Sequence, residues 1–477
     1  MNTATPEPLD HWIDGAPHRP QSDEYTVGTN PATGGSTVRI AAGTAADVDS
    51  AAKAATRAYP GWRYFSAPER GRILRRIADA IRAHADEFAD LEIQDTGKPR
   101  ATALAEVENS AAYFEFYSGL VNIPVGDVLD VEPGQHIYTR REPYGVVGII
   151  TPWNVPLNQA ARAVAPALVT GNVVILKPAE TSSQTTILLC RLATEIGLPD
   201  GVLNVVLGSG SVVGTAIVSH PAVRKVAFTG SVQTGRTIGR IAAERVIPLT
   251  LELGGKSANI VFADADLPKA AREAVRAFAA NAGQVCSAGT RLLVERSIHD
   301  EFVAQVAAIA GELREGDDIG PLITRGQFAQ VQEYFHIAQD EGIAAVIGGS
   351  VSGDPALGGG FYVKPTIYAD VDTDSRIARE EIFGPVLVTI PFDDEADAIR
   401  IANDSEFGLI AGVFTRDIGR ALRVADSIEA GQVFINTWST GAVQTPFGGH
   451  KNSGYGREKG IEAMLHYSHL KTVVAVY

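Results

Sequence analysis

The chain contains 477 residues, of which 45% are hydrophobic and 20% are charged, and its formal net charge is −15. This length exceeds what one compact core accommodates, and the composition is ordinary for a soluble globular protein, so two or three domains are expected. The acidic balance argues against nucleic acid or an anionic membrane as the main partner, because both require a basic surface.

The first elements predicted in chain order are two helices, at residues 47–58 and 68–96. In the second helix, isoleucines recur at helical spacing on one face. Residues 127–143 are typical of a β-hairpin, with Pro133-Gly134 at its turn.

An alternation of strands and helices begins at Gly145 and indicates a parallel α/β sheet. The predicted strands are 146–151, 172–177, 202–207 and 225–228, and the predicted helices are 159–168, 182–196 and 234–245. A second α/β unit follows Glu252, with strands at 259–262 and 291–294 and helices at 267–280 and 299–313. The last residues, 471–477, are predicted to form a strand that needs a partner edge, often on another subunit.

The two cysteines are too few for a disulfide framework. Residues 1–10 are polar and lack a signal pattern, and no apolar run reaches the length needed to span a bilayer. We therefore expect a cytoplasmic protein with reduced thiols. No metal site is expected, because two remote cysteines supply too few ligands.

The segment Phe228-Thr229-Gly230-Ser231 follows a predicted strand and opens a helix. Free backbone N–H groups at such a helix start can bind a phosphate. The spacing to the next glycine, Gly235, fits neither the usual dinucleotide fingerprint nor a Walker A loop. A tight strand-to-helix turn is therefore an equally good interpretation.

Two carboxylates suit the sugars of a nucleotide. Glu180 follows the strand that ends near Lys177, where a carboxylate can accept both ribose hydroxyls and repel a 2′-phosphate, which favours NAD over NADP. Glu381 and Phe383 stand two residues apart before the apolar run 386–390, so in extended backbone they share one side. The alternatives are a solvated turn for the first and a plain strand entry for the second.

A thiol, a carboxylate and an amide stand in segments that suit covalent catalysis. Cys286 lies among small and polar residues and Glu252 precedes a Gly-Gly turn, which makes them candidates for a nucleophile and a distant base. Asn154, between two prolines, can present its amide to a developing oxyanion, although an Asn that caps its own loop is the alternative. Cys190 continues an apolar helix and is expected in the core, a reading that Cys286 taken alone would share.

Taken in order, these segments resemble the NAD(P)-dependent aldehyde dehydrogenase superfamily, of the non-acylating, hydrolytic type. The resemblance runs from about residue 14 to residue 471 and includes Gly283-Gln284-Val285-Cys286 and Pro446-Phe447-Gly448-Gly449. It implies a Rossmann-like cofactor domain, a second α/β catalytic domain and a small β extension that builds homodimers or homotetramers. In this chain these would be residues 1–122 with 144–253, residues 254–449, and residues 123–143 with 450–477.

The resemblance also implies a chemical role for each of these groups. Cys286 would attack a small-molecule aldehyde, and Asn154 and the Cys286 N–H would hold the oxyanion. Glu252 would act as the general base that activates either Cys286 or the water that hydrolyses the thioester to the acid. Lys177 is a further catalytic candidate. The cofactor would be NAD, with NADP less favoured, and its expected contacts are Thr151, Pro152, Trp153, Lys177, Ala179, Glu180, Gly208, Gly210, Phe228, Thr229, Gly230, Ser231, Leu253, Gly254, Glu381 and Phe383.

The resemblance does not identify the aldehyde. Arg162 lies near where semialdehyde-oxidising relatives place an arginine for the far carboxylate, which favours a polar substrate, and a structural ion pair is the alternative. Trp438 suits an aromatic ring or a quaternary ammonium, so aromatic and betaine-type aldehydes stay open, as does a non-catalytic relative of the fold. The expected substrate-pocket residues are Asn158, Gln159, Arg162, Val285, Ser287, Trp438, Val443 and Phe447.

Overall fold

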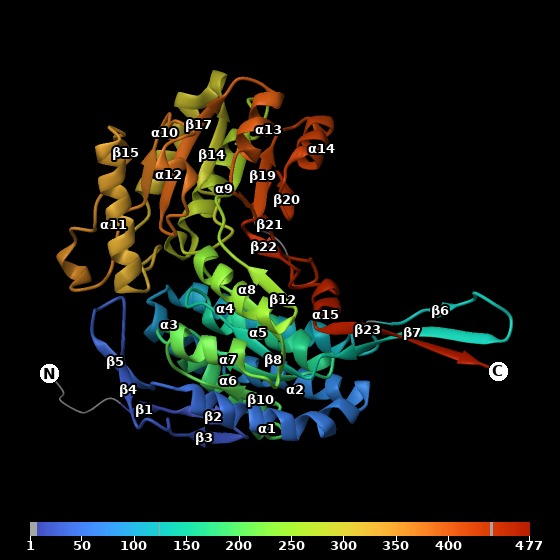
Figure 1. Ribbon diagram of the computed structural model, residues 1–477. Coiled ribbons are helices and arrows are strands. Elements are labelled where there is room, and N and C mark those ends of the chain that lie inside the picture. The colour runs from blue at the N-terminus through green and yellow to red at the C-terminus, as the bar shows by residue number, and fades with distance from the viewer. Residues whose placement is uncertain (1–6, 124, 439–441) are drawn as a thin grey trace.

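The computed structural model describes residues 7–123, 125–438 and 442–477. Two mainly parallel sheets, each packed with helices, form a lower and an upper half in Figure 1, and a narrow β arm leaves the lower half. The predicted α/β class with two units and a small β extension is therefore confirmed. Within the described residues, no helix combines the length and the apolar character that crossing a membrane requires.

The lower half is built on an eight-stranded sheet of order β22-β12-β11-β8-β9-β10-β2-β3. The strands from β12 to β10 are parallel, and β22, β2 and β3 add antiparallel edges. β8 and β9 are buried along their whole length, which explains their continuous apolar sequences. The bounds are β2 (His11–Ile13), β3 (Ala16–His18), β8 (Val146–Ile150), β9 (Val173–Lys177), β10 (Leu203–Val205), β11 (Val223–Thr229), β12 (Leu249–Glu252) and β22 (Gly454–Tyr455).

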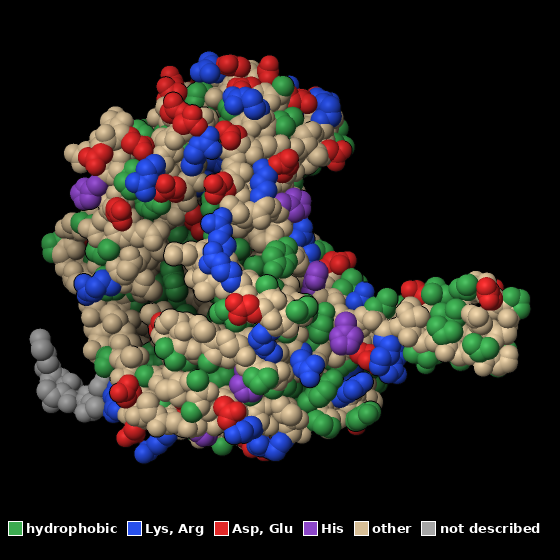
Figure 2. Space-filling view, viewed as in Figure 1, with side chains coloured by type: hydrophobic (Ala, Val, Ile, Leu, Met, Phe, Trp, Pro, Cys, Tyr) green, Lys and Arg blue, Asp and Glu red, His purple; other side chains and the backbone are tan. Residues whose placement is uncertain are grey.

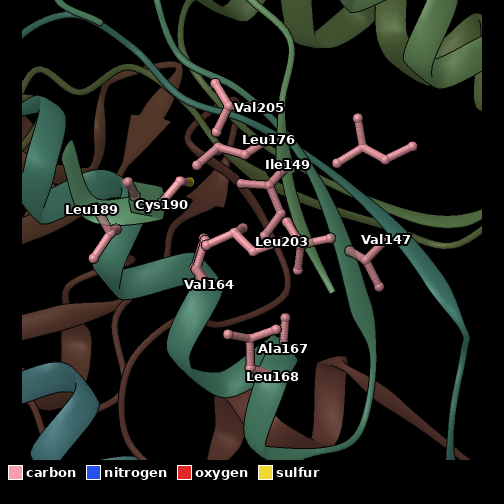
Figure 3. Close-up of a cluster of buried hydrophobic side chains, with 14 of the residues drawn as sticks. Val147, Ile149, Val164, Ala167, Leu168, Leu176, Leu189, Cys190, Leu203 and Val205 are labelled. Carbon is pink, nitrogen blue, oxygen red and sulfur yellow. The ribbon is translucent and has the colours of Figure 1, made fainter. Parts of the chain in front are cut away.

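Helices complete the core of this half. Figure 3 shows Cys190 of α6 in a cluster with Val164 of α5 and with Leu176 and Val205 of the sheet, so Cys190 is a core residue as predicted. The helices are α1 (Ala45–Tyr64), α2 (Ala67–Ala83), α3 (Ala85–Thr96), α4 (Arg100–Ser118), α5 (Pro156–Val169), α6 (Gln184–Glu195), α7 (Thr215–Ser219) and α8 (Val232–Arg245), with a π-helical turn at Gly210–Gly214. A small sheet of β1 (Pro8–Leu9), β5 (Ser36–Ala41) and β4 (Tyr25–Thr29) lies beside them.

The single helix predicted over 68–96 is wrong, because two helices meet at His84. The His84 backbone leaves the helical region at φ −111° and ψ 26°, and a ring nitrogen lies 2.9 Å from the Ala80 carbonyl. Phe88 is nevertheless buried on the second helix. The helical spacing of apolar residues therefore continues across the break at His84, and this spacing alone does not reveal that the helix is interrupted there.

The upper half is built on a seven-stranded sheet of order β15-β16-β17-β14-β13-β19-β20, parallel except at β15. Its strands are β13 (Ala258–Val261), β14 (Arg291–Glu295), β15 (Ala345–Ile347), β16 (Thr366–Tyr368), β17 (Val386–Phe392), β19 (Ile410–Phe414) and β20 (Gln432–Ile435). Its helices are α9 (Leu267–Ala279), α10 (His299–Gly311), α11 (Arg325–Asp340), α12 (Arg376–Arg379), α13 (Glu395–Asn403) and α14 (Ile418–Ser427). Short 3₁₀ turns lie at Ala280–Gly283, Arg296–Ile298 and Pro355–Leu357.

The chain returns to the lower half at its end and then forms the arm. β21 (His450–Lys451) pairs with β18 (Phe407–Gly408), β22 joins the first sheet, and α15 (Glu462–His466) leads into β23 (Ser468–Val476). β22 thus lies inside the range 450–477 that we assigned to the extension, and the domain boundaries stay a prediction.

The arm is an antiparallel sheet of order β23-β7-β6, made from β6 (Val128–Leu129), β7 (Gln135–Pro143) and β23. It projects from the molecule in Figure 1, and it confirms the predicted hairpin and terminal strand. β23 pairs with β7 from Ser468 opposite Pro143 to Val476 opposite Gln135. β23 is therefore a long edge strand, paired on one side within the described chain.

Candidate active site

A cavity of about 210 Å³ lies where the two halves meet, and Figure 2 shows the surface hollowed between them. Its walls come from loops at the ends of β8, β11 and β12 in the lower half and from the Cys286 and Glu381 segments in the upper half. Predicted residues supply most of the lining: Pro152, Trp153, Asn154, Gln159, Thr229, Gly230, Ser231, Leu253, Gly254, Cys286, Glu381 and Phe383. Gln327 and Gln330 of α11 also line it and were not predicted, because isolated glutamines on a helix carry no sequence signal.

The N-terminus of α8 opens into this cavity. Ser231 is the N-cap, and its hydroxyl accepts a hydrogen bond from the Thr234 N–H at 3.3 Å. Gly230 donates its N–H to the Glu252 carbonyl at 3.0 Å, which fixes the turn against the end of β12. The helix start therefore presents backbone donors in the position expected for a phosphate.

A carboxylate and two aromatic rings form the opposite side. Glu381 accepts the Gly255 N–H at 2.9 Å, and burial raises the pKa of its carboxyl to about 7. Phe383 adopts a left-handed backbone, φ 57°, and its ring meets the Trp153 ring edge-on, with centroids 5.4 Å apart. A bulky residue adopts this backbone at a cost, so the surrounding contacts hold the Phe383 ring against the cavity.

Other predicted cofactor residues lie outside this cavity. Lys177 is buried at the end of β9, where its ammonium donates to the Pro178 carbonyl at 2.8 Å and meets the Glu180 carboxylate at 3.4 Å. Lys177 lines neither cavity that contains Cys286 and lies instead beside the ribose candidate Glu180, and its catalytic role stays a prediction. Also outside the lining of this cavity are Thr151, Ala179, Gly208, Gly210 and Phe228.

A second cavity, of about 320 Å³, lies on the other side of Cys286. Cys286, Asn154 and Gln159 line both cavities, so the thiol stands at the junction between them. The predicted residues Asn158, Arg162, Val285, Ser287 and Phe447 also line the second cavity. Residues that were not predicted complete its walls: Thr102, Glu106, Asn109, Val155, Ala280, Asn281, Gln432, Phe434 and Lys459.

Two predicted pocket residues do not line this second cavity. Trp438 instead lines a neighbouring cavity of about 230 Å³, together with Val285 and Ser287. Val443 is buried in the hydrophobic core of the lower half. Trp438 and Val443 therefore lie in different surroundings, and their contact with the substrate stays a prediction.

The Cys286 loop is fastened to Asn154. The side-chain amide of Asn154 donates to the Gln284 carbonyl at 2.8 Å, and Asn281 and Ala282 adopt left-handed backbones, with φ of 50° and 54°. Burial raises the pKa of the Cys286 thiol to about 12, although the Arg162 charge opposes this rise. The thiol is therefore protonated at neutral pH, and a nucleophilic role requires a base.

Glu252 lies at the end of β12 with both carboxyl oxygens buried and without a hydrogen-bond partner among the described residues. Gly448 packs so closely that a Cβ there would stand 2.7 Å from a Glu252 oxygen. Burial, and then the nearby Glu458, raises the pKa of Glu252 well above its usual value. The carboxyl is therefore held protonated in this position, out of the lining of both cavities at Cys286.

Arg162 forms a buried ion pair with Glu458, which is the alternative that the sequence left open. Its guanidinium also lies over the Phe447 ring, 4.6 Å from the centroid. The Nη2 atom has no hydrogen-bond partner among the described residues, and the side chain still lines the second cavity. Glu458 was missed, although the charged run Arg457-Glu458-Lys459 between two glycines was a signal that could have revealed it.

Comparison with known proteins agrees with this arrangement. The model of the aldehyde dehydrogenase family matches residues 18–473. A putative aldehyde dehydrogenase from Burkholderia cenocepacia is 41% identical, with a TM-score of 0.96 over 98% of this chain and 97% of that chain. A betaine aldehyde dehydrogenase from Staphylococcus aureus in complex with NAD+ is 37% identical, with a TM-score of 0.96 over 98% of this chain and 94% of that one. An NAD+ complex of an aldehyde dehydrogenase from Bacillus cereus is 37% identical, with the same TM-score over 98% and 97%. This chain therefore belongs to the aldehyde dehydrogenase family.

Proposed function

We propose that the protein oxidises an aldehyde to the carboxylic acid with NAD, through a covalent intermediate on Cys286. The observation that carries the proposal is the position of Cys286 between two cavities, one lined by the predicted cofactor residues and the other by polar and charged side chains. A nucleophile in that position separates a bound cofactor from a bound substrate and lies within reach of both.

The residues around the first cavity fit NAD. The α8 N-terminus suits the pyrophosphate, the Glu381 carboxylate suits a ribose hydroxyl, and the Trp153 and Phe383 rings can flank a flat ring. Glu180 repels a 2′-phosphate, which favours NAD over NADP. When bound, NAD supplies the hydride acceptor for the reaction.

The chemistry at Cys286 follows from its surroundings. The Cys286 thiol releases its proton to water as the sulfur adds to the aldehyde carbon, and the new alkoxide accepts hydrogen bonds from the Asn154 side-chain amide and the Cys286 backbone N–H. Loss of hydride from this tetrahedral adduct leaves a thioester on Cys286. Water then attacks the thioester, the thiol leaves, and the acid is released.

Glu252 serves as the general base for the attacking water. Its buried, unpartnered position favours the protonated form, so we infer that the side chain rotates towards the polar cavity, where it ionises and accepts the proton. The two residues that follow Glu252 in the chain, Leu253 and Gly254, line the first cavity, so the Glu252 backbone lies beside it.

The second cavity supports an aldehyde with an anionic far end. Lys459 lines it and has no ion-pair partner among the described residues. Arg162 uses Nε to bind Glu458 and, within the described part of the chain, keeps Nη2 free. Burial lowers the pKa of Lys459 to about 8, so the ammonium stays mostly protonated at neutral pH.

A quaternary ammonium substrate would meet the cations of Lys459 and Arg162 in this second cavity, and Trp438, the ring expected to contact it, lines a different cavity. The one carboxyl among the described residues of this lining, Glu106, contacts Lys98, and burial raises its pKa to about 8, so it offers little negative charge to such a substrate.

We expect succinic semialdehyde to be oxidised with a kcat/KM roughly tenfold or more above that of butanal, because a charged hydrogen bond is worth about 1.5–3 kcal/mol. Lys459→Met should reduce this preference, and Lys459→Arg should retain it. The measurement is NADH formation under steady-state conditions with both aldehydes and with betaine aldehyde.

Butanal is the internal control, because its turnover should change little in Lys459→Met. If the unmodified enzyme prefers butanal or betaine aldehyde, the proposal of an anionic substrate is wrong, while the proposed chemistry at Cys286 still holds. No NADH from any aldehyde would contradict the proposed function itself.

The arm supports assembly into a homodimer or homotetramer. Leu470, Val474 and Val476 lie on one face of β23 with 54%, 57% and 76% of their surface exposed. Val128 of β6 is also exposed on this arm. An edge strand with such apolar side chains is normally covered, and a second copy of the chain offers the matching edge.

Leu470→Glu combined with Val474→Glu is therefore expected to shift the protein to a smaller oligomer in sedimentation velocity and light scattering. Ala475→Glu, on the opposite face of the same strand, is the matched control and should leave the mass unchanged. An unmodified protein that sediments as a monomer would contradict the proposed assembly.

A further inference from the structure

Lys98 is a buried lysine that the chemistry described above does not use. It lies in the loop between α3 and α4 with 2% of its surface exposed. Its ammonium contacts Glu106 of α4 and lies 3.2 Å from the Glu92 carboxylate of α3. Burial lowers the pKa of Lys98, but the charges of Glu106 and Glu92 raise it by more, so the ammonium stays charged.

The third contact of this ammonium is with Asn154. The Lys98 Nζ lies 3.3 Å from the Asn154 carbonyl oxygen and donates to it. The Asn281 side-chain amide, from the upper half, donates to the same oxygen at 3.0 Å. One carbonyl therefore receives donors from both halves of the molecule.

The same residue is also fixed through its side chain. One Asn154 amide hydrogen is directed to the Gln284 carbonyl at 2.8 Å. The Gln284 side chain in turn donates to the Pro321 carbonyl at 3.2 Å and accepts the Ile323 N–H at 2.8 Å. One N–H of the Asn154 side-chain amide is therefore bound to the Gln284 carbonyl, and only the second N–H is available to an oxyanion. The direction of this second N–H depends on the position of the Asn154 backbone, to which the side chain is attached.

We propose that Lys98 is a positioning residue for the oxyanion donor Asn154, and that it acts together with Asn281 by clamping the Asn154 carbonyl. The inference rests on the proposed function, because it takes Asn154 as the donor to the alkoxide. The clamp fixes the remaining Asn154 N–H relative to Cys286, whose loop begins at Asn281. It also places a positive charge behind the peptide that carries the donor.

A structural role is the competing explanation, since a lysine between two buried carboxylates stabilises the α3–α4 loop. The two explanations differ in one measurable respect. A positioning residue loses its effect on rate when the group that it positions is removed, whereas a structural residue does not.

The experiment is a double-mutant cycle with Lys98→Met and Asn154→Ala, read out as the rate of the first NADH formed in stopped flow at saturating NAD and a neutral aldehyde. Lys98→Met is expected to slow this step by roughly tenfold or more, because small misplacements of a catalytic group cost up to about 10²-fold. Lys98→Arg should restore most of the rate. In the Asn154→Ala background, Lys98→Met should change the rate by about twofold or less.

Two measurements and two further variants accompany the cycle. NAD affinity, from fluorescence quenching, and the melting temperature separate a rate effect from a folding effect. Lys225→Met is the matched control, because Lys225 is also a buried lysine of the lower half and donates to Thr250 at 2.7 Å rather than to Asn154. Asn281→Ala removes the other donor to the same carbonyl and should show the same dependence on Asn154, which keeps the test valid if Lys98→Met does not fold.

An equal loss of rate from Lys98→Met in both backgrounds would overturn the proposal and leave a structural lysine. A full rate in Asn281→Ala would also count against the clamp. An unchanged first NADH in Asn154→Ala alone would overturn the oxyanion role itself, and the role of Lys98 with it.

Discussion

Cys286→Ala is expected to abolish aldehyde-dependent NADH formation, with turnover at least about 10⁴-fold below that of the unmodified enzyme, because the other cysteine, Cys190, is buried in the core away from the cavities. NAD binding should persist, since the thiol is one of many residues around the cofactor cavity. Stopped-flow absorbance for NADH and fluorescence quenching for NAD affinity measure the two properties separately.

The second cysteine provides the control for this prediction. Cys190 is fully buried in the lower core, and burial raises its pKa far above the usual value, so it should resist iodoacetamide. Alkylation of the unmodified protein without NAD should therefore stop at one thiol. Its rate should rise about tenfold per pH unit from pH 8 towards the Cys286 pKa of about 12, because only the thiolate reacts. Aldehyde turnover in Cys286→Ala would contradict the nucleophile.

Glu252→Gln is expected to lower steady-state turnover by about 10²–10⁴-fold, the usual effect of losing a general base. The first NADH should still form, because hydride loss precedes hydrolysis, and the acyl group should then remain on Cys286. Stopped flow measures the burst, and intact-protein mass spectrometry detects the added acyl mass.

The Glu252→Gln substitution removes the titratable carboxyl and hardly changes the shape of the side chain, so the test reports on the loss of the base. Glutamine has nearly the shape of glutamate, and Gly448 leaves space for the side chain in its buried position, so little repacking is expected. Full turnover in Glu252→Gln would remove Glu252 from the mechanism. Loss of the burst as well would indicate that Glu252 also accepts the thiol proton.

Much of the architecture could be predicted because its causes are local. The strands β8 and β9 are buried on both faces and are apolar throughout, and the helices between strands have the lengths that parallel crossovers require. The break at His84 could not be predicted in this way, because it depends on one backbone conformation within a continuous apolar pattern.

The residues of the candidate site also differ in how far the sequence predicts them. Cys286, Asn154, Glu252 and Glu381 stand in short motifs whose composition suits their proposed chemistry, so they could be found from sequence. The partners of Arg162 and Asn154 could not, because Glu458 and Lys98 are 296 and 56 positions away and meet them only through the tertiary fold. The different surroundings of Trp438 and Val443 could not be predicted for the related reason that they too are set by the tertiary fold.

Residues 454–476 are synthesised late, and the contacts that they make can therefore form only late in folding. β22 completes the edge of the first sheet, Glu458 neutralises Arg162, and β23 pairs with β7, all within the final residues 454–476. The N-terminal part of a nascent chain folds first. Until Glu458 leaves the ribosome, Arg162 therefore has no ionic partner, and an unpaired buried charge costs about 3–5 kcal/mol. A chain interrupted between Cys286 and Glu458 would contain the nucleophile but lack the ionic partner of Arg162 in the wall of the substrate cavity.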